Sequence, residues 1–423
     1  MSQDTNPAGR SWLLPALGAV GLILAIGLAG QLTRTSPVRP KTEPVAAISS
    51  TQAELASNTL VEWSQDDQPG PVSFKSGDLE LTLSEQVSSE GNAPLLVVRQ
   101  NGKVVAEVVG TPWFGRASAE FGVGRIDLTS SAPQVIFTTF TGGAHCCADI
   151  KLIELHKGAW KVMDVAVQDG DRLGEFPKDY DGDGRPEFRL GDDRFLYAFD
   201  AYAASWAPPS FHQVVDNKVI DVSASRKLRP HYQSFLNQLE PECRRGQNGA
   251  CAAYAAAAAR LGLIETAWPV VLEAYQRDSD WTYPGPCRAA LVEGACPDGE
   301  QVRFETYPEA LRWFLGDAGY LPPIYLPVTQ SQTPSFKCEN AEAEVLQLIC
   351  ATPELAKADR ELAWLYQRSQ ILSADTAAGR EAERAFLAQR DAGPPDVFVL
   401  LRLYEGRLQA LRDQLAAQSA ALR

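Results

Sequence analysis

The chain has 423 residues, of which 45% are hydrophobic, and this is enough to bury more than one core. Its formal net charge is -14. Because phosphate binding requires a basic face, this charge excludes nucleic acid as the main partner. We expect a multidomain α+β protein with an acidic surface.

The first feature along the chain is an uncharged apolar run at residues 12–32, within a segment that we assign to residues 1–34. It is long enough to cross the inner membrane as a helix. Two interpretations stay open: an uncleaved signal anchor, and a signal peptide cut near residues 27–29, where small residues suit cleavage. Residues 35–57 are rich in Pro, Ser, Thr and Ala and are typical of a flexible linker.

Residues 58–228 are predicted to form a β-rich domain. Strand-like stretches recur at 78–83, 95–98, 104–109, 134–140, 149–155 and 160–167. Asn101-Gly102 is a strong signal for a two-residue hairpin turn. The stretch Pro133–Phe137 also lines up with Pro186–Leu190, an offset of roughly fifty residues that is typical of propeller-blade-like repeats.

An acidic loop in this domain is the clearest candidate site. The segment from Asp179 to Glu187 (DYDGDGRPE) places oxygen-bearing residues at alternate positions, with glycines that let the backbone turn around an ion. This pattern is typical of Ca²⁺ binding. A full EF-hand would have Glu at the twelfth loop position, which is Leu190 here. Two alternatives stay open: a calcium site, and a solvated acidic turn that binds nothing.

The loop resembles the short calcium loop of FG-GAP and VCBS repeats. The resemblance implies calcium ligands at Asp179, Asp181, Asp183, the carbonyl of Arg185, and Glu187. Glu187 stands where that family usually has Asp, which lengthens the ligand and keeps its charge. Since all ligands belong to one tight loop, we expect a structural ion rather than a catalytic one.

The eight cysteines fall into four close pairs, which suits local disulfides in an oxidising compartment. Zinc is the alternative, but it would favour a Cys-x-x-Cys spacing or a nearby His pair. The main body is therefore expected on the periplasmic side of a bacterial inner membrane, or in the periplasm if the N-terminus is cleaved. The expected disulfides are Cys146–Cys147, Cys243–Cys251, Cys287–Cys296 and Cys338–Cys350.

The turn His145-Cys146-Cys147 is the place where chemistry could occur in this domain. The first interpretation is a vicinal disulfide that stiffens the turn, with His145 as a hydrogen-bonding neighbour. The second is a binding or redox role. The third is catalysis by a thiolate nucleophile, for which no orienting Asn or Asp can be named. No catalytic residue is assigned.

Residues 229–320 read as a helical region that carries two of the disulfides, and 321–334 as a proline-rich linker. Aromatic residues of the helical region recur near helical spacing, which is typical of a hydrophobic core. The helices are expected at 231–239, 250–261, 265–276 and 308–315.

Residues 335–423 are predicted to form a C-terminal three-helix bundle, because apolar residues recur there at three-and-four spacing. The segment resembles the LprI-type lysozyme inhibitor N-terminal domain family. The matching residues are Phe336, Cys338, Ala341, Val345, Ile349, Cys350, Pro353 to Ala356, Asp359, Leu362, Ala363 and Gln389 to Asp391.

The LprI resemblance implies a protein-interaction module, with lysozyme as a candidate partner. That family commonly has a second cysteine pair, and Gly393 and Val399 stand in its place here. Both cysteines are absent together, so no lone thiol remains. Positive and negative residues nearly balance after Ser335, so electrostatics give a cationic lysozyme little preference for this segment.

Three functions therefore stay open from the sequence. The first is a membrane-tethered or secreted periplasmic binding protein that is not an enzyme, with a structural Ca²⁺ and a protein partner. The second is an envelope enzyme or redox protein that uses the His145 turn. The third is a lysozyme inhibitor.

Overall fold

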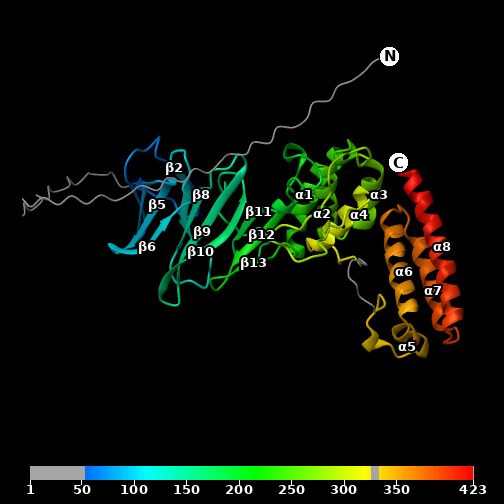
Figure 1. The fold of residues 1–423 in the computed structure, drawn as a ribbon. Coiled ribbons are helices and arrows are strands. Elements are labelled where there is room, and N and C mark those ends of the chain that lie inside the picture. Colours follow the sequence, from blue (N-terminus) through cyan, green and yellow to red (C-terminus); the bar gives the residue numbers. More distant parts are fainter. Residues whose placement is uncertain (1–52, 325–332, 423) are drawn as a thin grey trace, which may run out of the picture. The chain divides into compact units, whose positions relative to one another are not determined.

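The computed structural model describes residues 53–324 and 333–422 (Figure 1). The expected signal anchor or signal peptide at residues 12–32 lies outside these residues. Among the described residues, no helix has the length and apolar character needed to cross a membrane. The described chain is a mixed α+β protein with a β-rich N-terminal half and a helical C-terminal region, which confirms the expected fold class at that level.

The first sheet is a meander of four antiparallel strands with a short parallel strand at its edge. Its order is β1-β3-β4-β5-β6, with bounds β1 (Ala53–Glu54), β3 (Val72–Ser76), β4 (Leu79–Ser88), β5 (Gly91–Gln100) and β6 (Lys103–Val109). Asn101 and Gly102 form the turn between β5 and β6, and both have positive φ, as a type I′ hairpin requires. β1 falls inside 35–57, the range expected to be linker, because a strand of two residues shows no periodicity.

The second sheet contains five antiparallel strands in the order β10-β9-β8-β7-β2. Both of its faces are covered, so β7 and β8 are buried along nearly their whole length, including polar residues such as Glu120 and Gln134. One face shares a core with the first sheet, through side chains such as Trp63, Phe74 and Phe121. Its bounds are β2 (Thr59–Ser64), β7 (Ser118–Gly124), β8 (Gln134–Phe140), β9 (Cys146–His156) and β10 (Ala159–Asp169).

A third sheet covers part of the other face of the second. It has the order β11-β12-β13, with bounds β11 (Glu187–Gly191), β12 (Pro209–Val214) and β13 (Val219–Asp221). Ile136 and Ile150 of the second sheet share a core with Phe188 of the third. The two segments that align in the sequence thus lie in different sheets, β8 in the second and β11 in the third. The FG-GAP resemblance stays a prediction.

The helical region follows three short 3-10 helices, η1 (Asp193–Phe195), η2 (Tyr202–Ala204) and η3 (Arg226–Leu228). Its helices are α1 (Arg229–Arg244), α2 (Asn248–Leu261), α3 (Ile264–Ala274) and α4 (Tyr307–Asp317). Residues 250–258 of α2 are all buried, and seven of these nine are alanines. Neighbouring backbone can therefore approach α2 closely.

The C-terminal segment contains η4 (Cys338–Asn340), α5 (Glu344–Ala351), α6 (Pro353–Ile371), α7 (Ala377–Asp391) and α8 (Val397–Ala421). The expected three-helix bundle is therefore wrong in helix number, because the first expected helix is split into α5 and α6. The break falls at Thr352-Pro353, since a residue before proline disfavours the helical conformation and proline lacks an N–H.

Four disulfides join the eight cysteines, and no free cysteine is present among the described residues. The bonds are Cys146–Cys147, Cys243–Cys251, Cys287–Cys296 and Cys338–Cys350.

Candidate functional site

A pocket of about 600 Å³ lies in the β-rich half, and its floor is set by strand register. Ser64 of β2 lies opposite Ser118 of β7, and Glu62 lies opposite Glu120. Directly opposed residues project from the same face of a sheet, so these four side chains form two adjacent rows. The rows lie on the face away from the Trp63 core. The floor of the pocket is therefore polar.

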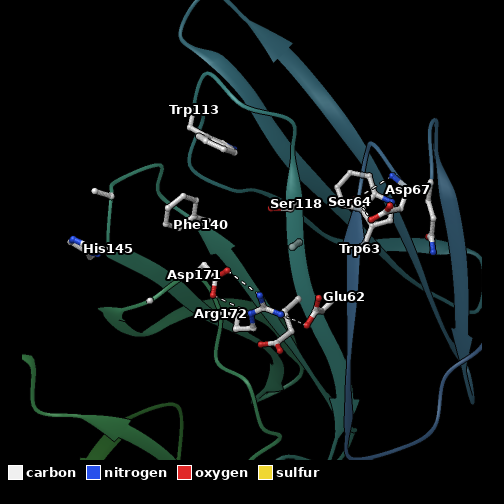
Figure 2. Close-up of a pocket in the computed structure, with 15 residues that line it drawn as sticks. Glu62, Trp63, Ser64, Asp67, Trp113, Ser118, Phe140, His145, Asp171 and Arg172 are labelled. Atoms are coloured by element: carbon white, nitrogen blue, oxygen red, sulfur yellow. Dashed lines mark hydrogen bonds and ion pairs between the residues drawn. The ribbon is translucent and has the colours of Figure 1, made fainter. Parts of the chain in front are cut away.

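Aromatic residues form one side of the pocket and polar residues the other. Figure 2 shows Trp113, Phe140 and His145 on one side, and we call these three residues the aromatic side. Figure 2 also shows Glu62, Ser64 and Asp67 across from them, and we call these the polar side. The rings of Trp113 and Phe140 are 5.5 Å apart and meet edge to face at 79°.

The Cys146–Cys147 turn positions His145 at the pocket. The loop is closed by hydrogen bonds from the Thr141 N–H to the Cys147 carbonyl and from the Cys147 N–H to Thr141 Oγ1, at 2.9 and 2.8 Å. The His145 carbonyl accepts from the Gly170 N–H at 2.8 Å, which ties this loop to residues 170–172. A side chain at Gly142 would collide with Trp113, and its φ of +91° also favours glycine.

His145 faces an aromatic ring rather than a thiol. Its ring stacks on Tyr202 with centroids 4.1 Å apart, and the Tyr202 hydroxyl donates to Asp169 at 2.6 Å. That hydrogen bond raises the pKa of Tyr202 to about 12, so the phenol stays protonated at neutral pH. Both neighbouring sulfurs are in a disulfide, and a nucleophilic thiolate at Cys146 or Cys147 would require its reduction.

Arg172 carries the positive charge of the pocket. Its guanidinium pairs with Asp171 at 3.0 Å and with Glu62, as the dashed lines in Figure 2 show. These hydrogen bonds raise the pKa of Arg172, and the same contact holds the pKa of Asp171 below its usual range. The pocket holds four carboxylates, Glu62, Asp67, Glu120 and Asp171, against this one guanidinium.

Glu120 differs from the other carboxylates because it is only 5% exposed. It accepts hydrogen bonds from the N–H groups of Leu173 and Gly174, at 2.9 and 3.1 Å. Burial raises the pKa of Glu120 despite these two donors. Glu120 therefore anchors the loop that carries Arg172.

The acidic loop lies directly before β11. Carboxylate oxygens of Asp179, Asp181, Asp183 and Glu187 all lie within 4.8 Å of one another. Calcium binds oxygen at 2.3–2.6 Å, so ligands on opposite sides of the ion are roughly 5 Å apart, and the cluster has the size and donor chemistry that Ca²⁺ requires. The Arg185 N–H donates to Asp183 at 2.7 Å, which tightens the turn.

Two polar side chains outside the loop hold the cluster in place. Gln213 of β12 donates to Asp183 at 3.0 Å and to the fully buried Glu187 at 2.6 Å. Ser225 donates to Asp181 at 3.0 Å. Burial raises the pKa of Glu187, and repulsion from the nearby Asp181 and Asp183 raises it further. The hydrogen bond from Gln213 lowers the pKa of Asp183.

The bundle brings together residues that carry the LprI resemblance. Asp359 is buried and pairs with the buried Arg390 at 3.5 Å. The Tyr404 hydroxyl donates to Asp359 at 2.9 Å, and Ser335 donates through both its N–H and its hydroxyl. This network joins α6, α7 and α8. Of the two positions where the LprI resemblance implies cysteines, the half-buried Gly393 lies between α7 and α8, and the exposed Val399 lies in the first turn of α8.

Most of the pocket corresponds to no motif in the sequence. Of its residues, His145 is a sequence-predicted candidate, whereas Glu62, Trp113, Phe140 and Arg172 are not. These residues are spread over 111 positions, from 62 to 172, and the pairing of β7 with both β2 and β8 brings distant parts of the chain together. The one available signal was the aromatic and glycine content of residues 113–115 and 140–143.

The fold and this site together define a class: a disulfide-bonded, multidomain α+β protein with an acidic loop and an amphipathic pocket. A family model described as the sll0997 C-terminal domain matches residues 225–319, which is nearly the helical region. The probable thylakoid lumen protein sll0997 of Synechocystis sp. (strain ATCC 27184 / PCC 6803 / Kazusa) is 31% identical over 258 residues, 58% of this chain and 74% of that protein. The chain belongs to the family of sll0997.

A second relative is the uncharacterized protein y4bJ of Sinorhizobium fredii (strain NBRC 101917 / NGR234). It is 33% identical over 282 residues, which are 64% of this chain. The matched part spans 44% of the length of y4bJ. No solved structure matches the chain. The matching family model is neither the LprI-type nor the FG-GAP family, so both of those resemblances stay predictions.

Proposed function

We propose that the chain is an extracytoplasmic binding protein that holds a small ligand in the pocket beside His145 and does not transform it. The observation that carries this proposal is the pocket itself, in which the aromatic side lies across from the polar side. The sulfurs of Cys146 and Cys147, next to His145, are bonded to each other, so neither is a free thiolate nucleophile. Concave pockets of this size that combine aromatic side chains with convergent polar groups are typical of small-molecule sites.

The extracytoplasmic location is supported by two observations. Four disulfides require an oxidising compartment. The relative sll0997 is described as a probable thylakoid lumen protein. In the same proposal, residues 12–32 either tether the protein to the inner membrane or are removed as a signal peptide.

A thermal-shift screen of the full chain tests binding against catalysis. A ligand present at about 100 times its Kd stabilises the folded state by about 2.7 kcal/mol, which raises the Tm. Binding predicts compounds that raise the Tm of the wild type, have no such effect on Trp113→Ala, and are recovered unchanged. Consumption of these compounds would establish the alternative, an envelope enzyme or redox protein at the His145 turn.

We also propose that the acidic loop binds a structural Ca²⁺ through Asp179, Asp181, Asp183 and Glu187, with the carbonyl of Arg185. The proposal rests on the 4.8 Å cluster and on the hydrogen bonds that anchor it to Gln213 and Ser225. A bound ion would neutralise the repulsion between these carboxylates, and so stabilise the junction between β11, β12 and the start of the helical region.

Asp183→Asn is the first test of the calcium site. The change removes one charged ligand, so we expect at least about a tenfold loss of calcium affinity and a smaller rise in Tm on adding calcium. Terbium luminescence sensitised by Tyr180, which lies in the loop, reports occupancy directly. Asp164→Asn is the matched control, since Asp164 is an exposed aspartate on β10 outside the cluster. Equal calcium responses in Asp183→Asn and the wild type would rule out this site.

A protein partner at the bundle is a second candidate function, favoured by the exposed Phe398 at the start of α8, which is 77% exposed. Lysozyme is the partner that the LprI resemblance implies. The full chain is expected to slow lysozyme turnover, and Phe398→Ala to weaken that effect. Undiminished lysozyme activity at about a hundredfold molar excess of the chain would remove this candidate.

A further inference from the structure

We propose that the ligand of the pocket is an uncharged oligosaccharide. The inference rests on the proposed binding function and adds the chemical class of the ligand. Sugar rings have one face of C–H groups and an edge of hydroxyl groups. The pocket has the same division between its aromatic side and its polar side (Figure 2).

The aromatic side fits the C–H face of a sugar ring. The faces of aromatic rings carry partial negative charge, and the C–H groups of a sugar carry partial positive charge, so the two pack favourably. Trp113 supplies the largest ring and is partly exposed in the pocket. Phe140 supports it edge to face, and the glycine at 142 lets the His145 loop close against it.

Arg172 and its two carboxylate partners offer donors and acceptors next to each other. Each sugar hydroxyl both donates and accepts, so it is best matched by a carboxylate beside a guanidinium. Arg172 lies between Glu62 and Asp171, so a guanidinium donor stands beside a carboxylate acceptor on both of its sides. The side chains of Glu62 and Arg172 are 67% and 47% exposed, so hydroxyl groups of a ligand can reach both.

The charges and hydrogen-bonding groups of the pocket disfavour the other common ligand classes. Four carboxylates against one guanidinium repel phosphates and carboxylates. A quaternary ammonium would gain from Trp113 and from the acidic residues, but it would leave the paired donors and acceptors around Arg172 without hydrogen-bonding partners. A neutral ligand with many hydroxyl groups meets neither penalty.

Aromatic residues continue beyond the pocket, which favours a chain of sugars over a single one. Phe114 follows Trp113 directly and is 94% exposed. On the other side, His145 stacks on Tyr202, and Tyr202 packs on the half-exposed Tyr197 with ring centroids 5.6 Å apart. Large exposed aromatic residues beside a pocket are typical of binding surfaces.

The test is calorimetric titration of the full chain, in buffer with calcium, with three sets of probes. The first set contains uncharged hexasaccharides of glucose, mannose, galactose and N-acetylglucosamine. The second contains charged oligosaccharides, hexagalacturonate and a glucosamine hexamer. The third contains choline and spermidine. We expect at least one uncharged hexasaccharide to bind, and to bind at least about tenfold more tightly than its charged counterparts.

Two variants assign the binding to the pocket. Trp113→Ala removes the main aromatic face, and Arg172→Gln removes a half-exposed charge that supports no core. Each is expected to weaken the sugar by at least about tenfold. Arg125→Gln is the matched control, an exposed arginine outside the pocket, and should bind as the wild type does.

Each contrary result has its own meaning. If only charged probes or choline bind, and Trp113→Ala abolishes that binding, the sugar inference is wrong and the binding function stands. Sugar binding that Trp113→Ala and Arg172→Gln leave unchanged places the sugar elsewhere and overturns the inference. If none of the probes binds, and the thermal-shift screen finds no Trp113-dependent ligand, both the inference and the proposed binding function fail.

Discussion

At the scale of single residues, Glu120 connects the stability of the protein with its pocket. It is buried in β7, and its carboxylate holds the N–H groups of the loop that carries Arg172. Because burial raises its pKa, the folded protein holds this proton more tightly than the unfolded chain does. Protonation of Glu120 therefore adds to the free energy of unfolding. This contribution is complete below the ordinary carboxyl pKa, and it is lost as the pH rises through the raised pKa of the folded state.

Glu120→Gln should remove this pH dependence. The free energy of unfolding of the wild type, minus that of the variant, is expected to be larger at about pH 4 than at about pH 7. Urea unfolding at the two pH values measures it. Glu107→Gln, at an exposed glutamate on β6, provides the control and should show no such trend. If the difference in unfolding free energy between the wild type and Glu120→Gln is the same at both pH values, Glu120 does not have a raised pKa in the folded protein.

At the scale of secondary-structure elements, the buried pair Asp359–Arg390 joins the helices of the bundle. Asp359 also accepts from Tyr404 and Ser335, so its two carboxylate oxygens make four contacts in all. Removing Asp359 leaves the buried Arg390 paired only with the half-exposed Asp391, and it leaves Tyr404 and Ser335 without their acceptor, which costs far more than the buried pair contributes.

Asp359→Ala is expected to destabilise the protein by about 3–5 kcal/mol. Loss of helical circular dichroism during urea unfolding measures the change. The control is Asp413→Ala, which alters an exposed aspartate on α8 that accepts only from Gln409, and it should stay within about 0.5 kcal/mol of the wild type. A similar effect from both variants would show that Asp359 is an ordinary surface charge.

Local sequence patterns predict individual turns, strands and helices well, but they do not predict how the strands pair. Asn101-Gly102 predicted the β5–β6 turn because both residues tolerate positive φ, a property of the residues themselves. The periodicity near Leu348 and Leu355 predicted one helix, and the conformational effect of Pro353 divides it in two. The pocket depends on the pairing of Glu62 with Glu120, 58 residues apart, and no local pattern encodes that register.

At the scale of the whole molecule, the net charge of -14 acts on the folded state as a whole. Like charges repel one another in the compact state, and dissolved salt screens that repulsion. We expect the Tm at about pH 7.5 to rise when NaCl increases from about 0.02 M to about 0.5 M in metal-free buffer. Near the isoelectric point of about 4.9, the same series should give little rise. A Tm that falls with salt at neutral pH would mean that ion pairs outweigh the net repulsion.

The alanine-rich helix α2 limits how this chain can diverge. Residues 250–258 are buried on every side, so even one added methylene group there costs about 1–3 kcal/mol. Most substitutions in this stretch would be removed by selection for folding, whatever ligand the protein binds. As relatives drift apart, resemblance should therefore persist longest around α2, a helix that contributes no residue to the pocket and lies inside the matched residues 225–319. The packing of α2 therefore constrains every relative that keeps this helix, whatever ligand that relative binds.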